Sequence, residues 1–335
     1  MNILLTGGAG YIGSHAAVVL TEAGHNVTIF DNFCNSHHSV IDALNKITGK
    51  ELTMVEGDIR DTDLMDRALS DNKIEAVMHF AGLKSVAESV EKPALYFDNN
   101  VGGTLSLIKA MQKNNIKIFV FSSSATVYGE PQYLPIDEEH PLKPTNPYGE
   151  TKLKIEQMLS QLNNDEKDWR IICLRYFNPA GAHSSGLIGE SPKGNPNNLM
   201  PYILRVALGE LPYLKVFGDD FATSDGTGVR DYIHVTDLAD GHLKALNYAI
   251  KHKGCSFFNL GTGEGLSVLQ LLKTFKEVTA HQITYQIKSR REGDVATSYA
   301  KVEKAASELD FHPTLHKQDL CQSAWFFYKT SIGKL

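Results

Sequence analysis

A tyrosine and a lysine four residues apart, Tyr148 and Lys152, form the pair in this chain whose types and spacing suggest chemistry. On a helix, residues i and i+4 lie on the same face, so a Lys152 ammonium could stand near the Tyr148 phenol. That cation is expected to lower the phenol pKa from its ordinary value near ~10 and so to make Tyr148 a base. The spacing is common by chance, and the alternative is an exposed helical pair without chemistry.

A glycine-rich segment near the start of the chain favours the catalytic interpretation. Gly7, Gly10 and Gly13 form a G-x-x-G-x-x-G pattern between an apolar run and a helical pattern, where a tight turn could hold a pyrophosphate. Asp31, 18 residues after Gly13, ends the next apolar run and could accept hydrogen bonds from an adenosine ribose. Because its charge would repel a 2'-phosphate, the pattern predicts NAD rather than NADP. A purely structural glycine turn is the alternative.

A run of three serines, Ser122, Ser123 and Ser124, follows another apolar stretch. Removing a hydride from a carbinol requires a base for the hydroxyl proton and a partner that orients the hydroxyl, and Tyr148 and Ser124 could fill these roles. For Ser122 and Ser123, ordinary turn chemistry is the competing interpretation. The chain has no G-x-S-x-G segment, so a serine nucleophile has little support.

The elements that must position these residues alternate between strand and helix patterns, which predicts a doubly wound parallel sheet of the Rossmann type. Helices are expected to begin near Tyr11, Asp61, Pro93 and Pro147, since proline suits the first turn of a helix. Strands are predicted over residues 2–6, 26–30, 53–56, 76–80, 116–122 and 170–176.

A change of composition indicates a second, smaller lobe of mixed α/β structure. Between Pro179 and Asp231 the chain is rich in Gly, Pro, Asn and Ser, and ligand contacts concentrate in such loop-rich regions. A helix pattern and a strand pattern follow it and suggest that the chain crosses back. We therefore expect an NAD-binding domain over residues 1–178, to which residues 232–262 return, and a substrate-binding lobe over residues 179–335.

Length and charge point to a small-molecule partner. The chain has 335 residues and a formal net charge of -6 without any block of Lys and Arg, which argues against nucleic acid or an anionic membrane. The four cysteines are scattered, and no stretch approaches ~18 apolar residues, so we expect a cytoplasmic protein with reduced thiols. The polar pairs at 37–38 and 219–220 lack metal-ligand spacing, and no metal is expected.

Together, residues 7–13, 122–129 and 148–152 resemble the extended short-chain dehydrogenase/reductase family. Residues 31–36, 79–84, 175–179 and 225–234 are similar to the branch of that family that acts at C4 of UDP-hexoses. The resemblance covers nearly the whole chain, to at least residue 294. It implies a seven-stranded sheet, and a homodimer formed through the helices at 93–114 and 147–163.

The activity that the resemblance implies is NAD-dependent C4 epimerisation of UDP-galactose and UDP-glucose through a transient 4-keto sugar. Tyr148 would be the base, Lys152 would lower its pKa and hold the nicotinamide ribose, and Ser124 would bridge to the sugar oxygen. Dehydratases of the family carry an Asp-Glu pair after the hydroxyl residue and decarboxylases usually a Glu, whereas this chain has Ala125 and Thr126. The alternatives are another nucleotide-sugar enzyme of the family and, in a different class, a silent NAD sensor.

The resemblance also implies two sets of ligand contacts. For the UDP-sugar these are Ser124, Asn178, Asn198, Leu199, Val216, Phe217, Arg230, Arg291, Asp294 and Ser298. For NAD they are Gly7, Gly10, Tyr11, Ile12, Gly13, Asp31, Asn32, Asn35, Ser36, Asp58, Ile59, Phe80, Ala81, Gly82, Lys84, Asn99, Ser122, Tyr148, Lys152 and Phe177. Within that set Asp58 would face the adenine, although a capping role fits it equally well.

One departure from the family pattern predicts substrate range. Several epimerases of this type carry a bulky Tyr four residues after the Asp that corresponds to Asp294, whereas here Ser298 stands at that spacing and Tyr299 follows it. A small residue would admit an N-acetyl group, so we expect interconversion of UDP-N-acetylglucosamine and UDP-N-acetylgalactosamine as well. If Tyr299 occupied the pocket instead, the larger sugars would be excluded.

Overall fold

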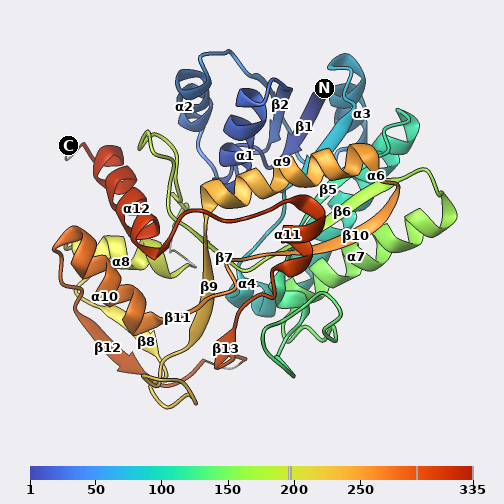
Figure 1. The fold of residues 1–335 in the computed structure, drawn as a ribbon. Helices are drawn as coiled ribbons and strands as arrows, with labels where there is room; N and C mark the ends of the chain where they lie inside the picture. The colour runs from blue at the N-terminus through green and yellow to red at the C-terminus, as the bar shows by residue number, and fades with distance from the viewer. Residues whose placement is uncertain (195, 197, 292, 334–335) are drawn as a thin grey trace.

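The computed structural model describes residues 1–194, 196, 198–291 and 293–333, and its main feature is a seven-stranded sheet (Figure 1). All neighbouring strands of this sheet pair in parallel, so their carboxyl ends meet at one edge. The predicted doubly wound sheet is confirmed. In spatial order the strands are β10 (Gly254–Leu260), β6 (Arg170–Tyr176), β5 (Ile118–Ser124), β4 (Ala76–His79), β1 (Asn2–Thr6), β2 (Asn26–Asp31) and β3 (Thr53–Glu56).

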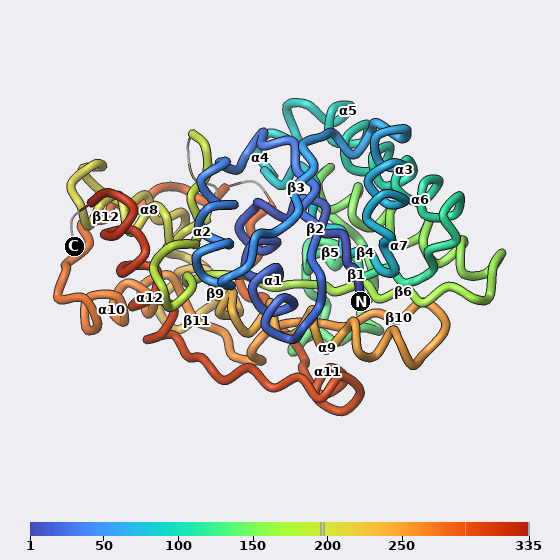
Figure 2. Tube along the Cα trace, turned by 90° about the horizontal axis from the view of Figure 1, so that it is seen from above, coloured from blue at the N-terminus to red at the C-terminus, as the bar shows by residue number. Residues whose placement is uncertain are grey.

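Helices cover both faces of the main sheet (Figure 2). One face carries α1 (Tyr11–Glu22), α2 (Ser39–Thr48), α9 (Val235–Lys251) and α11 (Glu303–Leu309). The other carries α3 (Thr62–Asp71), α6 (Gly103–Lys113) and α7 (Pro147–Asp165).

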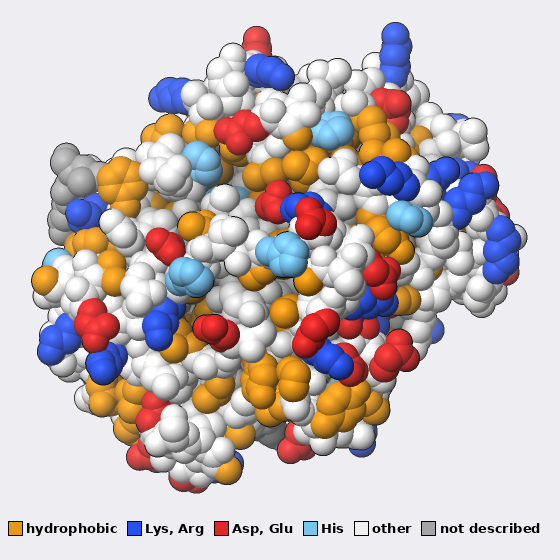
Figure 3. Space-filling model, in the orientation of Figure 1, with side chains coloured by type: hydrophobic (Ala, Val, Ile, Leu, Met, Phe, Trp, Pro, Cys, Tyr) orange, Lys and Arg blue, Asp and Glu red, His pale blue; other side chains and the backbone are white. Residues whose placement is uncertain are grey.

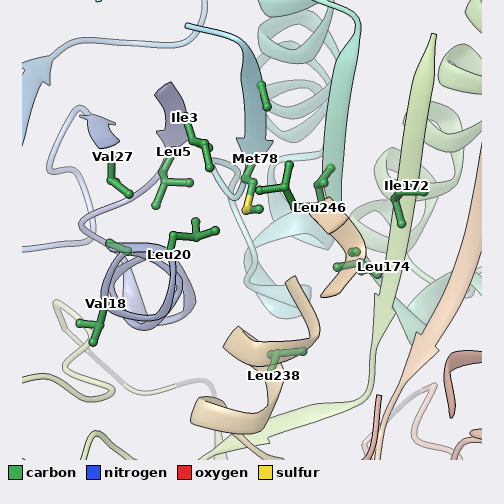
Figure 4. Packing of buried hydrophobic residues seen from close by; sticks show 14 of the residues in the cluster. Ile3, Leu5, Val18, Leu20, Val27, Met78, Ile172, Leu174, Leu238 and Leu246 are labelled. Carbon is green, nitrogen blue, oxygen red and sulfur yellow. The ribbon is translucent and has the colours of Figure 1, made fainter. Parts of the chain in front are cut away.

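Successive residues of the strands point to opposite faces of the sheet, so they contribute in turn to the two hydrophobic cores that lie between the sheet and its helices. Leu5 and Leu174 pack on the α1 and α9 side, in the cluster that also contains Leu238 and Leu246 (Figure 4). Leu4 points to the opposite side, toward α3 and α6. Full burial of each such side chain is worth roughly 1.5–3 kcal/mol. The apolar strands are therefore held in register, and their polar carboxyl ends are left to face ligands.

The helix predicted to run from Pro93 to residue 114 is present over residues 93–113, and its middle widens into a π-helical turn. After α4 (Val86–Glu91) and α5 (Pro93–Tyr96), a wider π-helical turn over Phe97–Gly102 precedes α6. The turn directs the Asn100 amide inward, where its Oδ1 accepts from Leu83 N at 2.8 Å and its Nδ2 donates to Thr151 Oγ1 at 3.1 Å. Such turns often occur at functional sites, and this one ties the loop after β4 to α7.

The smaller lobe lies beside the carboxyl edge of the sheet (Figure 1). Its strand β9 (Val229–His234) pairs with β7 (Asn178–Ala180), β11 (Gly265–Ser267) and β13 (Thr297–Ser298). None of the helices over the described residues combines the length and apolar character needed to cross a bilayer. The remaining elements are β8 (Leu214–Phe217) paired with β12 (Tyr285–Lys288), the helices α8 (Leu199–Ala207), α10 (Val268–Thr279) and α12 (Lys317–Ser331), and the short 3-10 turn Ala125–Val127.

Candidate active site

The glycine loop between β1 and α1 borders a cavity of about 530 Å³ at the carboxyl edge of the sheet. Gly7 has φ +69°, and a Cβ there would lie 2.6 Å from Ala81 N; a Cβ at Gly13 would lie 2.4 Å from Gly7 O. Only glycine fits these two positions. At the start of α1, Gly10 provides no side-chain cap, and the first N–H groups of a helix have no intrahelical partner. The helix N-terminus is therefore suited to a pyrophosphate, as a dinucleotide cofactor requires.

Asp31 ends β2 at the rim of the same cavity and is 8 % exposed. Its Oδ2 accepts from Ala9 N at 3.0 Å, and its Oδ1 accepts from Phe33 N at 2.9 Å and Ser36 Oγ at 3.0 Å. Asp31 therefore shapes the loops around the cavity. Because a carboxylate has about four acceptor positions, it can also take ribose hydroxyls.

The cavity brings together most residues predicted to contact NAD. Asp58 is not among its lining residues: its carboxylate is paired with Arg60 at 2.8 Å, which lowers the Asp58 pKa to about 2. Phe177 lies instead in a buried cluster with Tyr128 and Ile136. The predicted residues that do line the cavity are Gly7, Gly10, Tyr11, Ile12, Gly13, Asp31, Asn32, Asn35, Ser36, Ile59, Phe80, Ala81, Gly82, Lys84, Asn99 and Ser122.

Helix α7 carries Tyr148 and Lys152, which do not line the cavity themselves, but Lys152 is bonded to Ser122, which does. The helix begins with Asn146, whose Oδ1 accepts from Gly149 N at 2.9 Å, and with Pro147 in its first turn, so the helix start is fixed locally. The buried Lys152 donates from Nζ to Ser122 O at 2.7 Å, and its Nζ lies 5.8 Å from the centroid of the Tyr148 ring. The two side chains thus share one helix face, as the spacing predicts.

The pKa values of this pair correct one prediction. Burial raises the pKa of Tyr148 to about 12, and a hydrogen bond with Ser124 acts in the opposite direction. Burial lowers the pKa of Lys152 to about 8, against a raising effect of Glu156. The predicted net lowering of the Tyr148 pKa is wrong for this structure, because the loss of water around the phenol outweighs the opposing effect of Ser124.

Ser124 is the last residue of β5 and is held on two sides. Its Oγ accepts from Thr126 N at 3.2 Å and from Thr126 Oγ1 at 3.0 Å, and its backbone stands beside Tyr176 in the sheet register. Ala125 and Thr126 form the turn that follows, so no carboxylate enters the site from these two positions. A phenol, a hydroxyl and an ammonium thus converge here, and this set can move a proton to or from a substrate hydroxyl.

The residues predicted to bind the nucleotide lie on the lobe. Arg291 forms a bidentate ion pair with Asp294, from Nε at 2.8 Å and from Nη2 at 3.1 Å. The same guanidinium lies 4.8 Å from the centroid of the Phe217 ring. Arg230, on β9, is electrostatically coupled to both members of the pair, and burial lowers its pKa. Val216, in contrast, is buried in the core of the lobe, so its side chain serves packing.

Three further predicted residues lie on the lobe and do not line the cavity. Asn198 stands at the N-cap position of α8, ahead of Leu199, but its side chain makes no cap bond, and its Nδ2 donates to Glu190 Oε1 at 2.6 Å instead. Asn178 begins β7 and pairs with Tyr232 of β9. Their backbones border the junction between the sheet and the lobe.

The register of β13 bears on Ser298. Ser298 pairs with Arg230 in parallel strands, so the two side chains lie on the same face of the small sheet. Tyr299 follows on the opposite face, where a Cβ at Gly265 would lie 3.5 Å from its ring. Gly265 pairs with Asp231, the residue after Arg230, which places Tyr299 away from the arginine.

Comparison with known proteins adds a family to this geometry. Residues 3–261 match the NAD dependent epimerase/dehydratase family. The chain belongs to this family. It is 49 % identical to UDP-glucose 4-epimerase of Bacillus subtilis (strain 168) over 333 residues, covering 99 % of this chain and 98 % of that protein. It is 51 % identical to UDP-glucose 4-epimerase of Dictyostelium discoideum over 324 residues, covering 96 % and 94 %.

Solved structures of similar proteins match the fold of this chain over its whole length. UDP-glucose-4-epimerase from Stenotrophomonas maltophila, with bound NAD and formylated UDP-arabinopyranose, is 47 % identical with a TM-score of 0.98, and coverage is 100 % of both chains. The Bifidobacterium longum enzyme in complex with NAD+ and UDP is 48 % identical with a TM-score of 0.96, covering 100 % of this chain and 99 % of that one.

The sequence analysis of this family member did not predict that a segment of the lobe, residues 187–192, lines the cavity. Within this segment, Glu190 bonds both Asn198 and Lys84, the latter at 3.3 Å. Lys193, directly after the segment, donates from Nζ to Phe33 O at 2.6 Å and so ties this segment to the loop after β2. These residues carry no motif, and the composition of residues 179–231 indicated only that ligands gather there.

Proposed function

We propose that this chain catalyses NAD-dependent epimerisation at C4 of UDP-galactose and UDP-glucose through a transient 4-keto sugar. The observation that carries the proposal is the convergence of Tyr148, Ser124 and Lys152 beside the cavity of the glycine loop. A bound NAD would supply the acceptor, and in its reduced form the donor, of the C4 hydride. Relatives at about 50 % identity named UDP-glucose 4-epimerase support the same reaction.

Tyr148 is proposed to take the proton of the C4 hydroxyl and to give it back to the epimerised product. Ser124 orients that oxygen, since its hydroxyl already bonds the phenol. Lys152 stabilises the phenolate electrostatically, because a buried ammonium favours a nearby negative charge. With Ala125 and Thr126 after Ser124, elimination and decarboxylation lack an acid at that position.

Arg230 and Arg291 are proposed to bind the diphosphate, which suits the bidentate donors of guanidinium. Asp294 is proposed to bind the uridine ribose, and Phe217 the base. The enzyme must grip the nucleotide firmly and the sugar loosely, because a rigidly held sugar could not present both faces to the hydride.

Ser298 supports a wider substrate range that includes UDP-N-acetylglucosamine and UDP-N-acetylgalactosamine. The register of β13 puts Ser298 on the face of Arg230 and Tyr299 on the other face. The residue nearest the proposed sugar pocket is therefore small, and the N-acetyl group has room.

A homodimer and a cytoplasmic location complete the proposal. Leu95, Phe97 and Leu105, in the segment predicted to pair, are 40 %, 37 % and 42 % exposed. Apolar side chains that are exposed together on one segment often mark an interface.

The four cysteines are unpaired, as is usual in a reducing compartment. On the face shown in Figure 3, cationic and anionic side chains intermix, which fits a small anionic ligand better than a nucleic acid.

One experiment separates this function from its rivals. Purified protein with NAD is given UDP-galactose, and the nucleotide sugars are resolved and weighed. Epimerisation yields UDP-glucose of unchanged mass, and dehydration lowers the mass by one water, whereas a silent NAD sensor yields no product. A decarboxylase would also leave UDP-galactose unchanged, because this sugar has no carboxyl group, but it would release carbon dioxide from UDP-glucuronate in a parallel reaction. Absence of UDP-glucose from folded, NAD-loaded protein would falsify the proposal.

A further inference from the structure

A buried ion pair, Glu156 with Arg175, lies one helical turn beyond Lys152 and takes no part in the proton transfer described above. The Glu156 and Arg175 side chains are 2 % and 3 % exposed. The guanidinium donates to both carboxylate oxygens, from Nε at 3.0 Å and from Nη2 at 2.8 Å. Apolar side chains of similar volume often stabilise a core equally well, so stability alone does not account for the pair.

The pair fastens α7 to the strand that presents Ser124. Ser123 on β5 donates from Oγ to Glu156 Oε1 at 2.6 Å. One turn earlier on the same helix, Lys152 donates to Ser122 O at 2.7 Å. Two successive turns of α7 are thus bonded to the two residues that directly precede Ser124, and both bonds are directional.

The same network reaches the strand that carries Ser298. Arg175 donates from Nη1 to Tyr128 Oη at 3.1 Å, and Tyr128 donates to Asn259 Oδ1 at 2.6 Å. Asn259 Nδ2 donates to Ile136 O at 2.9 Å, and Ile136 N donates to Tyr299 O at 3.0 Å. The network therefore spans both sides of the site.

We propose that Glu156 and Arg175 are positioning residues for the epimerisation, which hold α7 at the one register where Tyr148 and Lys152 meet Ser124. Apolar packing alone is not directional and allows a helix to shift slightly along a sheet. A displacement of roughly 1 Å can lower a rate by about 10²-fold. The inference rests on the proposed function, because the aligned groups are those assigned to it.

The test replaces the pair by apolar side chains in Glu156→Met/Arg175→Met. This double variant leaves no unpaired buried charge, so it should fold. We expect its kcat for UDP-galactose to fall about tenfold or more with KM within about twofold, because alignment rather than binding is lost. In the matched control, Lys117→Met/Glu166→Met, the ion pair at the far end of α7 is removed and kcat should be unchanged.

Two further measurements keep the test decisive. Amide hydrogen exchange of the peptide over residues 148–156 should be faster in the double variant than in the control, a readout that does not depend on turnover. If the double variant does not fold, Ser123→Ala, which removes a single bond to Glu156, must lower kcat by about threefold at constant KM. Wild-type kcat in the folded variants would overturn the proposal, whereas an inactive wild type with the same exchange difference would refute only the epimerase function.

Discussion

The two sides of the active site differ in how their polar groups are held. On the sheet side, Lys152 is 5 % exposed and bonded to a strand carbonyl, and Glu156 is fixed by Arg175. On the lobe side, the Arg291 side chain is 58 % exposed and its Asp294 partner 19 %. A buried ion pair with directional hydrogen bonds holds its two side chains in one geometry, because losing either partner leaves a buried charge unpaired. An exposed pair is worth only about 0–1 kcal/mol and exchanges partners readily.

This difference matches the two tasks that we assign to the two sides. Proton transfer needs groups fixed to a fraction of an ångström, and the parallel strands with α7 supply that. Nucleotide binding needs cations that can leave a weak partner such as Asp294 for a diphosphate. Substitutions on one side at a time test this difference. We expect changes on the sheet side to alter kcat, and changes on the lobe side to alter KM or substrate choice.

Damage to the sheet side should have the largest effect. Tyr148→Phe removes the proposed base while keeping the ring, and we expect kcat to fall by about 10²–10⁴-fold. The Kd for UDP-sugar, measured by calorimetry, should change little because the lobe is intact. Unchanged turnover would mean that another group takes the proton.

Ser298→Tyr should alter the lobe side in a selective way. A large ring on the face of Arg230 would overlap an N-acetyl group, and overpacking of roughly 1–3 kcal/mol corresponds to about a 10–100-fold loss for the N-acetylated pair. Turnover of UDP-galactose should persist. Tyr299→Phe, on the opposite face, is the control and should leave the ratio of the two activities as in wild type.

A milder change on the lobe side is Arg230→Lys. The charge remains but the bidentate fork is lost, so we expect KM to rise about tenfold with kcat nearly constant. The steady-state kinetics of both directions provide the measurement. A fall in kcat at constant KM would place Arg230 with the reacting groups instead.

The sequence was most informative where a local pattern determines local structure. The apolar runs gave β1, β3 and β6 with their observed bounds, because period and length specify a buried parallel strand. The glycine pattern predicted the tight turn after β1, and the structure shows that positions 7 and 13 tolerate no Cβ. The Tyr148 and Lys152 spacing predicted a shared helix face, and the fold provides it.

Other features depend on contacts between distant residues and have no local signal. The π-helical turn around Asn100 exists because its amide bonds Leu83 and Thr151, neither of which a helical pattern reveals. The direction in which the Tyr148 pKa shifts depends on how far the folded chain excludes water from the phenol. Glu190 reaches the cavity through a loop whose sequence indicates only irregular structure.

The smallest expected effect concerns pH and the sheet side. Burial lowers the Lys152 pKa from 10.5 to about 8 in the folded chain. Between these values the unfolded chain binds more protons than the folded chain, so the contribution of Lys152 to the unfolding free energy becomes more favourable as pH rises. Relative to Lys152→Met, wild-type apoprotein should therefore gain about 1 kcal/mol in urea unfolding from pH 8 to 9. An exposed lysine on the lobe side is replaced in the control, Lys215→Met, which should show no such trend. A flat wild-type difference would mean that Lys152 is hydrated, and the contrast between the two sides would then not extend to this residue.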